Sequence, residues 1–275
     1  MNTKSYAIVT ASYWGFTFTD GALRMLVLLH FHSLGFSPLK LAFLFLLYEF
    51  CGVLTNLLGG WVGSRIGLKV TLYTGLALQI IALLMLSMVN PQWAMTLSVS
   101  YVMASQALSG IAKDLTKMSS KSAVKLLVNE GEGALFKWVA ILTGSKNALK
   151  GVGFMLGGVS LTWLGFTHSL WLMAAALGLV LLAALIFLNQ DMGKSKKKIK
   201  FTQLFSKSRE INWLSASRFF LFASRDVWFV VALPVFLKTQ LNWSFNQVGS
   251  FMAAWVIAYG IVQASAPRLI GHHRP

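Results

Sequence analysis

Long hydrophobic stretches alternate with short polar connections along the whole chain. Apolar runs of about 20 residues are long enough to cross a bilayer core about 30 Å thick. Such runs cover residues 6–32, 41–63, 70–89, 93–112, 137–163, 168–188, 211–237 and 245–267. The first run contains Asp20 and Arg24 and lacks a small-residue cleavage site, so we expect a retained helix rather than a cleaved leader. The pattern predicts an all-α polytopic membrane protein with about eight transmembrane helices.

Lysine and arginine gather on alternate connections between these runs. The connections at 90–92 and 165–168 contain neither residue, and the remaining connections on that side contain only Lys40 and Lys238. The opposite side contains the other loop cations, namely Lys4, Arg65, Lys69, Lys117, Lys121, Lys125, Lys137 and the run 194–209. By the positive-inside rule we expect a multi-pass protein of the bacterial inner (plasma) membrane with a cytoplasmic N-terminus.

The most basic stretch, "GKSKKKIK" at 193–200, separates the sixth run from the seventh. It predicts a six-helix N-terminal half at 1–190, a cytoplasmic linker at 191–210 that contacts anionic membrane lipid, and the start of a C-terminal half at 211–275 with helices seven and eight. Segment 34–50 also resembles 241–257, because Ser37 aligns with Ser244 and Tyr48 with Trp255. Two similar halves are typical of transporters built from parallel repeats.

The composition supports a membrane protein and argues against several other classes. Hydrophobic residues make up 56% of the chain and charged residues 12%, with a net charge of +16. Because the alternating connections account for much of this charge, we expect no nucleic-acid partner. We find no nucleotide-binding loop, metal cluster or nucleophile triad, so we expect no cofactor, no metal and no enzymatic activity. The single cysteine, Cys51, does not suggest a thiolate site for soft metals.

The connection after the second run, "GGWVGSRIGLK" at 59–69, resembles the signature loop of the major facilitator superfamily. Gly60, Arg65, Gly67 and Lys69 match the family pattern, and the resemblance implies a gating role for this loop. Ser64 stands where the family has an aspartate, and Leu68 stands where it has a basic residue. An ion pair that uses this aspartate is therefore not expected here.

Charged residues inside the apolar runs are the main candidates for a functional site, because they are costly in lipid and usually face a cavity. Asp20 and Arg24, four residues apart, predict a local ion pair, as do Asp114 and its neighbouring lysines. Cations outnumber anions by about three among the embedded residues. The cations are Arg24, Lys113, Lys117, Lys146, Lys150, Arg218 and Arg225, and the anions are Asp20, Glu49, Asp114 and Asp226.

Lys146 and Lys150 share one helical face and have no acidic residue in their own helix. Lys146 lies about 15 Å along the fifth run, near the middle of the bilayer. An anionic solute is the expected partner, and Lys and Arg are usual ligands of phosphate. Asn147 is positioned to add a neutral hydrogen bond. The embedded cations therefore predict a binding site for a phosphorylated or multiply anionic solute.

Several stretches resemble the organoarsenical efflux permeases, the ArsJ family of the major facilitator superfamily. The likeness runs over nearly the whole chain and is most specific around the lysines at 113–125 and 146–150. The stretches are "SYWGFTFTDGALRMLVLLHFHSLGFSP" (12–38), "LAFLFLLYEFCGVLTNLLGGW" (41–61), "QALSGIAKDLTKMSSKSAVKLL" (106–127), "LFKWVAILTGSKNALKGVGF" (135–154) and "SRDVWFVVALPVFL" (224–237).

The resemblance implies export of 1-arseno-3-phosphoglycerate and hence arsenate resistance. This ester is made by a glyceraldehyde-3-phosphate dehydrogenase, which is therefore an expected functional partner. By analogy with relatives, proton antiport would need an embedded acid, for which Asp20, Glu49 and Asp226 are candidates. The alternatives are a permease for another organic phosphate or sugar phosphate, a non-transporting remnant or assembly partner, and, ranked last, an intramembrane enzyme.

The resemblance also implies about twelve helices, so we expect about four more than the runs in this sequence provide.

Overall fold

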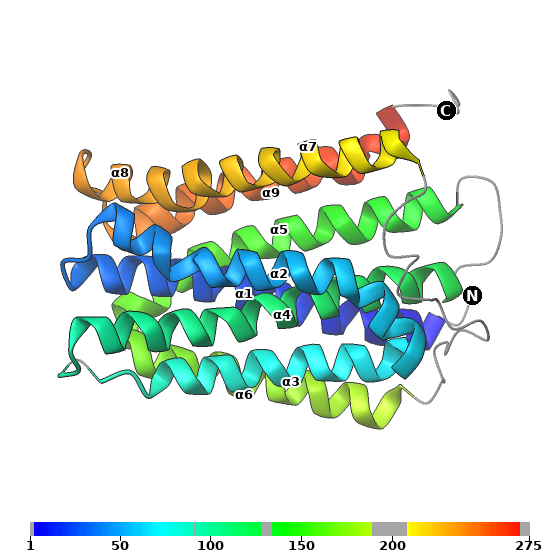
Figure 1. Ribbon diagram of the computed structural model, residues 1–275, viewed down its shortest axis with the longest axis horizontal. Helices are drawn as coiled ribbons and strands as arrows, with labels where there is room; N and C mark the ends of the chain where they lie inside the picture. Colours follow the sequence, from blue (N-terminus) through cyan, green and yellow to red (C-terminus); the bar gives the residue numbers. More distant parts are fainter. Residues whose placement is uncertain (1–2, 91, 128–133, 189–207, 270–275) are drawn as a thin grey trace.

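Long, nearly parallel helices form the whole of the part of the chain that the structure describes, which is residues 3–90, 92–127, 134–188 and 208–269 of a computed structural model (Figure 1). The elements are α1 (Thr3–Ser33), α2 (Pro38–Ile66), α3 (Leu68–Ser87), α4 (Met95–Leu127), α5 (Ala134–Trp163), α6 (Gly165–Phe187), α7 (Arg209–Arg225), the π-helix η2 (Asp226–Ala232), α8 (Leu233–Thr239) and α9 (Phe245–Leu269). The predicted all-α fold is confirmed.

Each apolar run corresponds to one continuous helical segment, which we call a rod. The first six runs match α1 to α6, the seventh matches the continuous α7, η2 and α8, and the eighth matches α9. Four of the described helices, namely α2, α3, α6 and most of α9, are long and apolar enough to cross a membrane by length and hydropathy. The embedded charges lower the hydropathy of α1, α4 and α5. The fourth rod was predicted too short, because α4 continues past residue 112 to Leu127 and carries Lys121 on a helix rather than in a connection.

The short connections contain the backbone features that end each rod. The turn between α2 and α3 is the single residue Gly67, whose φ of 94° favours glycine. Before α2, Gly35 has φ of 87°, and the side chain of Ser37 accepts a hydrogen bond from the Lys40 amide at 3.4 Å. Pro234 lies just after η2 and cannot donate a backbone hydrogen bond, which favours an irregular segment there.

The echo between 34–50 and 241–257 is visible in these helix starts. Asn242, with φ of 53°, precedes α9 as Gly35 precedes α2. Ser244 accepts a hydrogen bond from the Gln247 amide at 3.2 Å, and the Gln247 side chain accepts one from the Ser244 amide at 2.7 Å. The division into halves nevertheless stays a prediction, and the linker at 191–210 lies almost wholly outside the described residues.

The bundle places α1 among α4, α5 and α6, and packs α5 between α1 and α9. The α2–α3 turn, the end of α6 and the start of α7 lie at one end of the bundle, together with the start of α1 (Figure 1). We call this the inner end, because Lys4, Arg65 and Lys69 lie there and the positive-inside rule predicts that this side faces the cytoplasm. The buried apolar residues form two clusters, and α1 contributes to both, with Leu26 and Phe31 in one and Tyr13 and Phe16 in the other.

Candidate functional site

Charged side chains from three helices form an ion-pair network in the interior. An Arg24 nitrogen (Nη2) pairs with Glu49 of α2, and the second oxygen of Glu49 lies 3.2 Å from Nζ of Lys113 on α4. Lys113 is 3.8 Å from Asp114, and Asp114 accepts a hydrogen bond from Lys117 at 2.8 Å. Positive and negative groups therefore alternate from α1 through α2 to α4.

A second branch joins α5 to α1. The ammonium of Lys150 lies 3.2 Å from Asp20, whose other carboxylate oxygen accepts a hydrogen bond from the Tyr48 hydroxyl. Tyr48 also links the two branches, because its ring lies 4.3 Å from the Arg24 guanidinium and 4.2 Å from the Lys113 ammonium. The side chain of Asp20 is only 4% exposed, so Lys150 supplies the cation that a buried carboxylate needs.

These pairs correct one prediction and confirm another. The local pair predicted between Asp20 and Arg24 is replaced by pairs between helices, since Asp20 pairs with Lys150 and Arg24 with Glu49. The predicted pairing of Asp114 with neighbouring lysines is confirmed. Lys150, which was expected to lack a protein partner, has one.

Lys146 differs from every member of this network. It is partly buried, and no hydrogen bond or ion pair joins it to any other residue that the structure describes. The cations Lys150, Lys121 and Lys117 have the strongest electrostatic effects on it among its charged neighbours, and the opposing effect of Asp20 is smaller than each of these. The network already joins four cations to three carboxylates. Lys146 therefore lies in a positive environment that the described residues do not neutralise.

The residues beside Lys146 hold α5 to its neighbours. Asn147, predicted to contact a solute, donates a hydrogen bond from its side-chain amide to Gln263 of α9. Ser145 accepts a hydrogen bond from the indole of Trp14 on α1 at 3.0 Å. Both groups thus have protein partners, and they fix the rotation of α5 about its axis.

Glycines allow α5 to approach both neighbours closely. A methyl group added at Gly153 would lie 2.4 Å from the Phe18 carbonyl oxygen of α1, and one at Gly144 would lie 2.6 Å from the Gly260 carbonyl oxygen of α9. Gly21 of α1 is equally close to α5, since its methyl would lie 2.5 Å from the Lys150 carbonyl oxygen. Such contacts occur only between helices whose facing residues are small. They place Lys150 against Asp20.

The predicted site residues of the seventh rod are not brought into this network by any described contact. The side chains of Arg218 and Arg225, on α7, are exposed on the surface of this chain. Asp226 is the first residue of η2. Arg218 and Lys121 lie within electrostatic range of each other, which places this part of α7 beside the inner end of α4.

Most of the predicted gating loop is helical, because only Gly67 separates α2 from α3. Gly60 and Arg65 belong to α2, Gly67 forms the turn, and Lys69 belongs to α3. The guanidinium of Arg65 lies 4.5 Å from the ring centre of Trp61, and the Lys69 ammonium lies 5.9 Å from that of Tyr73. A methyl group at Gly60 would meet nothing within 4 Å, so close packing does not require glycine there.

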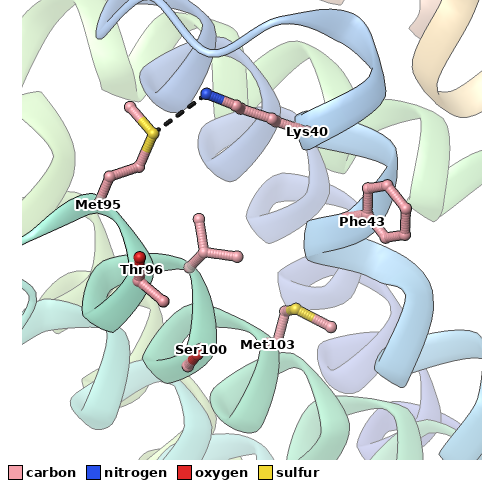
Figure 2. A pocket seen from close by; sticks show the side chains of 7 residues that line it. Lys40, Phe43, Met95, Thr96, Ser100 and Met103 are labelled. Atoms are coloured by element: carbon pink, nitrogen blue, oxygen red, sulfur yellow. Dashed lines mark hydrogen bonds between the residues drawn. The ribbon is translucent and has the colours of Figure 1, made fainter.

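Two cavities of similar size lie between α2 and α4. The outer pocket, of about 380 Å³, is at the start of both helices, where the Lys40 ammonium lies 3.1 Å from the Met95 sulfur and the wall is mostly apolar (Figure 2). The inner pocket, of about 340 Å³, lies nearer the inner end and is the more polar. It is lined by Asn56, Lys117, Met118, Lys121, Ser122 and Val139.

Sequence reasoning missed two parts of this site. Tyr48 was noted only as part of the echo between halves, although an aromatic residue next to Glu49 is a signal for a cation contact. Asn56, Lys121 and Ser122 were missed as pocket residues, because their meeting depends on how α2 packs against α4. No group of three or more His, Cys, Asp or Glu that would hold a metal ion occurs among the described residues, and Cys51 is a free, partly buried thiol there.

A bundle of long apolar helices around a buried charge network is the architecture of a polytopic membrane transporter. The sequence profile of the Major Facilitator Superfamily matches residues 8–275. The chain therefore belongs to this superfamily and is a membrane permease of the transporter type.

Comparison with solved structures supports the same fold. A chain described as "Crystal structure of a POT family transporter in complex with thioalcohol conjugated peptide" superposes with a TM-score of 0.69 at 14% sequence identity. The match covers 98% of this chain and 71% of that one. A search of curated proteins gave no match. The likeness at this identity concerns the fold, and it carries no information about the solute of this chain.

Proposed function

We propose that this transporter exports a small phosphorylated organic anion from the cytoplasm, and that 1-arseno-3-phosphoglycerate is its substrate. The resemblance to organoarsenical efflux permeases supports the identity of the substrate, and a glyceraldehyde-3-phosphate dehydrogenase would supply it. Export would lower the arsenate content of the cell and confer arsenate resistance. The protein would act in the bacterial inner membrane with its N-terminus in the cytoplasm, which the distribution of basic residues supports.

The observation that carries this proposal is the ammonium of Lys146, which has no hydrogen-bond or ion-pair partner among the residues that the structure describes. A cation that is partly buried among other cations is unfavourable until an anion neutralises it. Lys150, one turn away on the same face, adds a second donor for a phosphoryl or carboxylate oxygen. A dianionic solute would therefore gain most of its binding energy from this turn of α5.

The ion pair between Lys150 and Asp20 supports a route to proton coupling. A bound anion would compete with Asp20 for Lys150, and Asp20 without its cation would favour the protonated form. Release of the anion would return Lys150 to Asp20 and expel the proton on the same side, so this competition alone would carry the proton together with the anion. The proton antiport that the resemblance implies would need an acid that is protonated when the anion has left. Glu49, which pairs with Arg24 and Lys113, is the second candidate in this scheme, and Asp226 on the seventh rod is the third.

The test compares arsenic content in arsenate-challenged cells that make the dehydrogenase, with and without this chain. We expect arsenic to fall when the chain is present, and Lys146→Gln to abolish the fall. Lys146→Arg, which keeps the charge, should retain part of it. Lys4→Gln is the matched control, because Lys4 is an exposed lysine at the start of α1 and removes the same charge. All variants are compared at equal abundance in the membrane.

Two outcomes would contradict the proposal. If the parent chain reaches the membrane and arsenic does not fall, export of the arsenylated ester is wrong. If arsenic falls equally with Lys146→Gln, export is retained but its assignment to this lysine is wrong. Uptake of labelled 3-phosphoglycerate into everted vesicles then tests other organic phosphates and fixes the direction of transport.

A further inference from the structure

The inner pocket contains a second unmatched cation. Lys121 is partly buried, and no ion pair or hydrogen bond joins it to another residue within the described ranges. Its strongest electrostatic neighbours are Lys117 and Arg218, ahead of Asp114. Asp114 is itself already shared between Lys117 and Lys113. The single negative charge of Asp114 therefore does not neutralise the lysines of the pocket, which keeps a net positive charge.

The shape and the lining of the pocket suit a small anion. Lys117 and Lys121 are four residues apart on α4, so both ammonium groups project from one face toward the same space. Asn56 of α2 and Ser122 of α4 offer an amide and a hydroxyl beside them. The volume of about 340 Å³ is at the lower end of the range for small-molecule sites.

The pocket is connected to the rest of the charged site through Lys117. Lys117 lines the pocket and is also the last member of the network that begins at Arg24. Lys146 lies within electrostatic range of both pocket lysines. An anion in the inner pocket would therefore lie nearer the inner end than an anion bound by Lys146 and Lys150.

We infer that the inner pocket is a separate binding site for a phosphate monoester, in which Lys117 and Lys121 hold the phosphoryl oxygens and Asn56 and Ser122 hydrogen-bond the rest of the ligand. This inference rests on the proposed function, because it assigns the inner pocket as the site that a phosphorylated solute reaches first from the inner end. The phosphate monoester is either a free solute or the headgroup of a lipid such as phosphatidic acid, and the experiment distinguishes the two.

The experiment measures equilibrium binding of labelled 3-phosphoglycerate to the purified full chain in nanodiscs of phosphatidylcholine alone. We expect Lys121→Gln to weaken binding about tenfold or more, since it removes a charge-assisted hydrogen bond. Lys121→Arg should keep the affinity within about threefold, and Ser122→Ala should cause a smaller loss. Lys4→Gln is the control for charge alone. Because Lys121 has no described partner, these variants should unfold at the temperature of the parent chain.

Two results would overturn the inference. The first is binding of 3-phosphoglycerate that is equally tight in the parent chain and in Lys121→Gln. The second is bound 3-phosphoglycerate that neither unlabelled ligand nor phosphatidic acid displaces from the parent chain. Binding of phosphatidic acid alone, weakened by Lys121→Gln, would instead support the pocket and assign it to a lipid headgroup. Binding that depends on Lys121 supports the pocket even if arsenic export fails in cells. Export that is unaffected by Lys121→Gln contradicts the pocket and leaves the proposed function intact.

Discussion

Two successive turns of α5 each carry a lysine, but only one of the two lysines forms an ion pair with a described residue. Lys150 lies 3.2 Å from the buried carboxylate of Asp20, whereas Lys146 has no ionic or hydrogen-bond partner among the residues described. Both lysines face the same side of the helix and differ by only four positions. The difference arises on the neighbouring helices, because α1 presents a carboxylate to one turn and none to the next.

This contrast separates a structural lysine from a ligand-binding one. Removing one partner of a buried ion pair leaves the other charge uncompensated, which is strongly destabilising. Removing an unpartnered charge relieves a cost that the folded chain already bears. Stability measurements therefore distinguish the two roles without knowledge of the solute. A thiol-reactive dye on Cys51, the single cysteine of the sequence, can follow thermal unfolding in detergent.

The largest effect is expected for Lys150→Gln. This change leaves the Asp20 carboxylate, 4% exposed, without its cation, and should lower the free energy of unfolding by about 3 kcal/mol. The double variant with Asp20→Asn should recover most of the loss, because neither charge then remains. A double variant no more stable than Lys150→Gln alone would show that the lysine stabilises the fold through packing rather than through the ion pair.

A smaller loss of unfolding free energy is expected for Gly21→Ala, which would push α1 away from α5 at Lys150. The methyl group of Gly21→Ala would lie 2.5 Å from the Lys150 carbonyl oxygen, and the resulting shift should cost about 2 kcal/mol of unfolding free energy. Gly178→Ala on α6 is the matched control, because its methyl group meets nothing within 4 Å. Equal melting temperatures for the two variants would contradict the close contact of α1 with α5.

Tyr48→Phe tests the second group that contacts the Asp20 carboxylate, after Lys150. The hydroxyl donates a hydrogen bond to the carboxylate, and its loss should lower the free energy of unfolding by about 1.5 kcal/mol. The ring contacts with Arg24 and Lys113 remain in the phenylalanine variant. In an Asp20→Asn background the same substitution should cost less, and an unchanged cost would argue against coupling of the two groups.

The smallest effect on stability is expected for Lys146→Gln. Because no described partner is lost, the free energy of unfolding should fall by no more than about 0.5 kcal/mol, and an increase is consistent with the same reasoning. A loss as large as that of Lys150→Gln would show that Lys146 is structural, and the contrast between the two turns would then be wrong.

The sequence was sufficient to locate the apolar rods and several of their ends, because hydropathy and turn residues are local properties, but it missed the end of α4, which continues past residue 112 to Leu127. Gly67, Ser37 and Ser244 lie at helix boundaries as the patterns indicate. The ion-pair partners on different helices could not be predicted from the sequence, because they depend on how each helix is rotated and shifted along its axis relative to its neighbours. For this reason Arg24 was paired with the wrong carboxylate and Lys121 was missed as a pocket residue. The pairing of Asp114 was predicted correctly because it is local.

The glycines of α5 also bear on how that helix can move. Gly144, Gly151 and Gly158 contact α9, and Gly153 and Gly157 contact α1 on the opposite side. At these five positions no α5 side chain separates the helix from its neighbour. A slide of α5 along its axis would therefore move no α5 side chain at these five positions, and it would have to break the hydrogen bonds of Asn147 with Gln263 and of Ser145 with Trp14. The two lysines travel with that rod, so a displacement of one residue, about 1.5 Å, is enough to present them to a different set of neighbours.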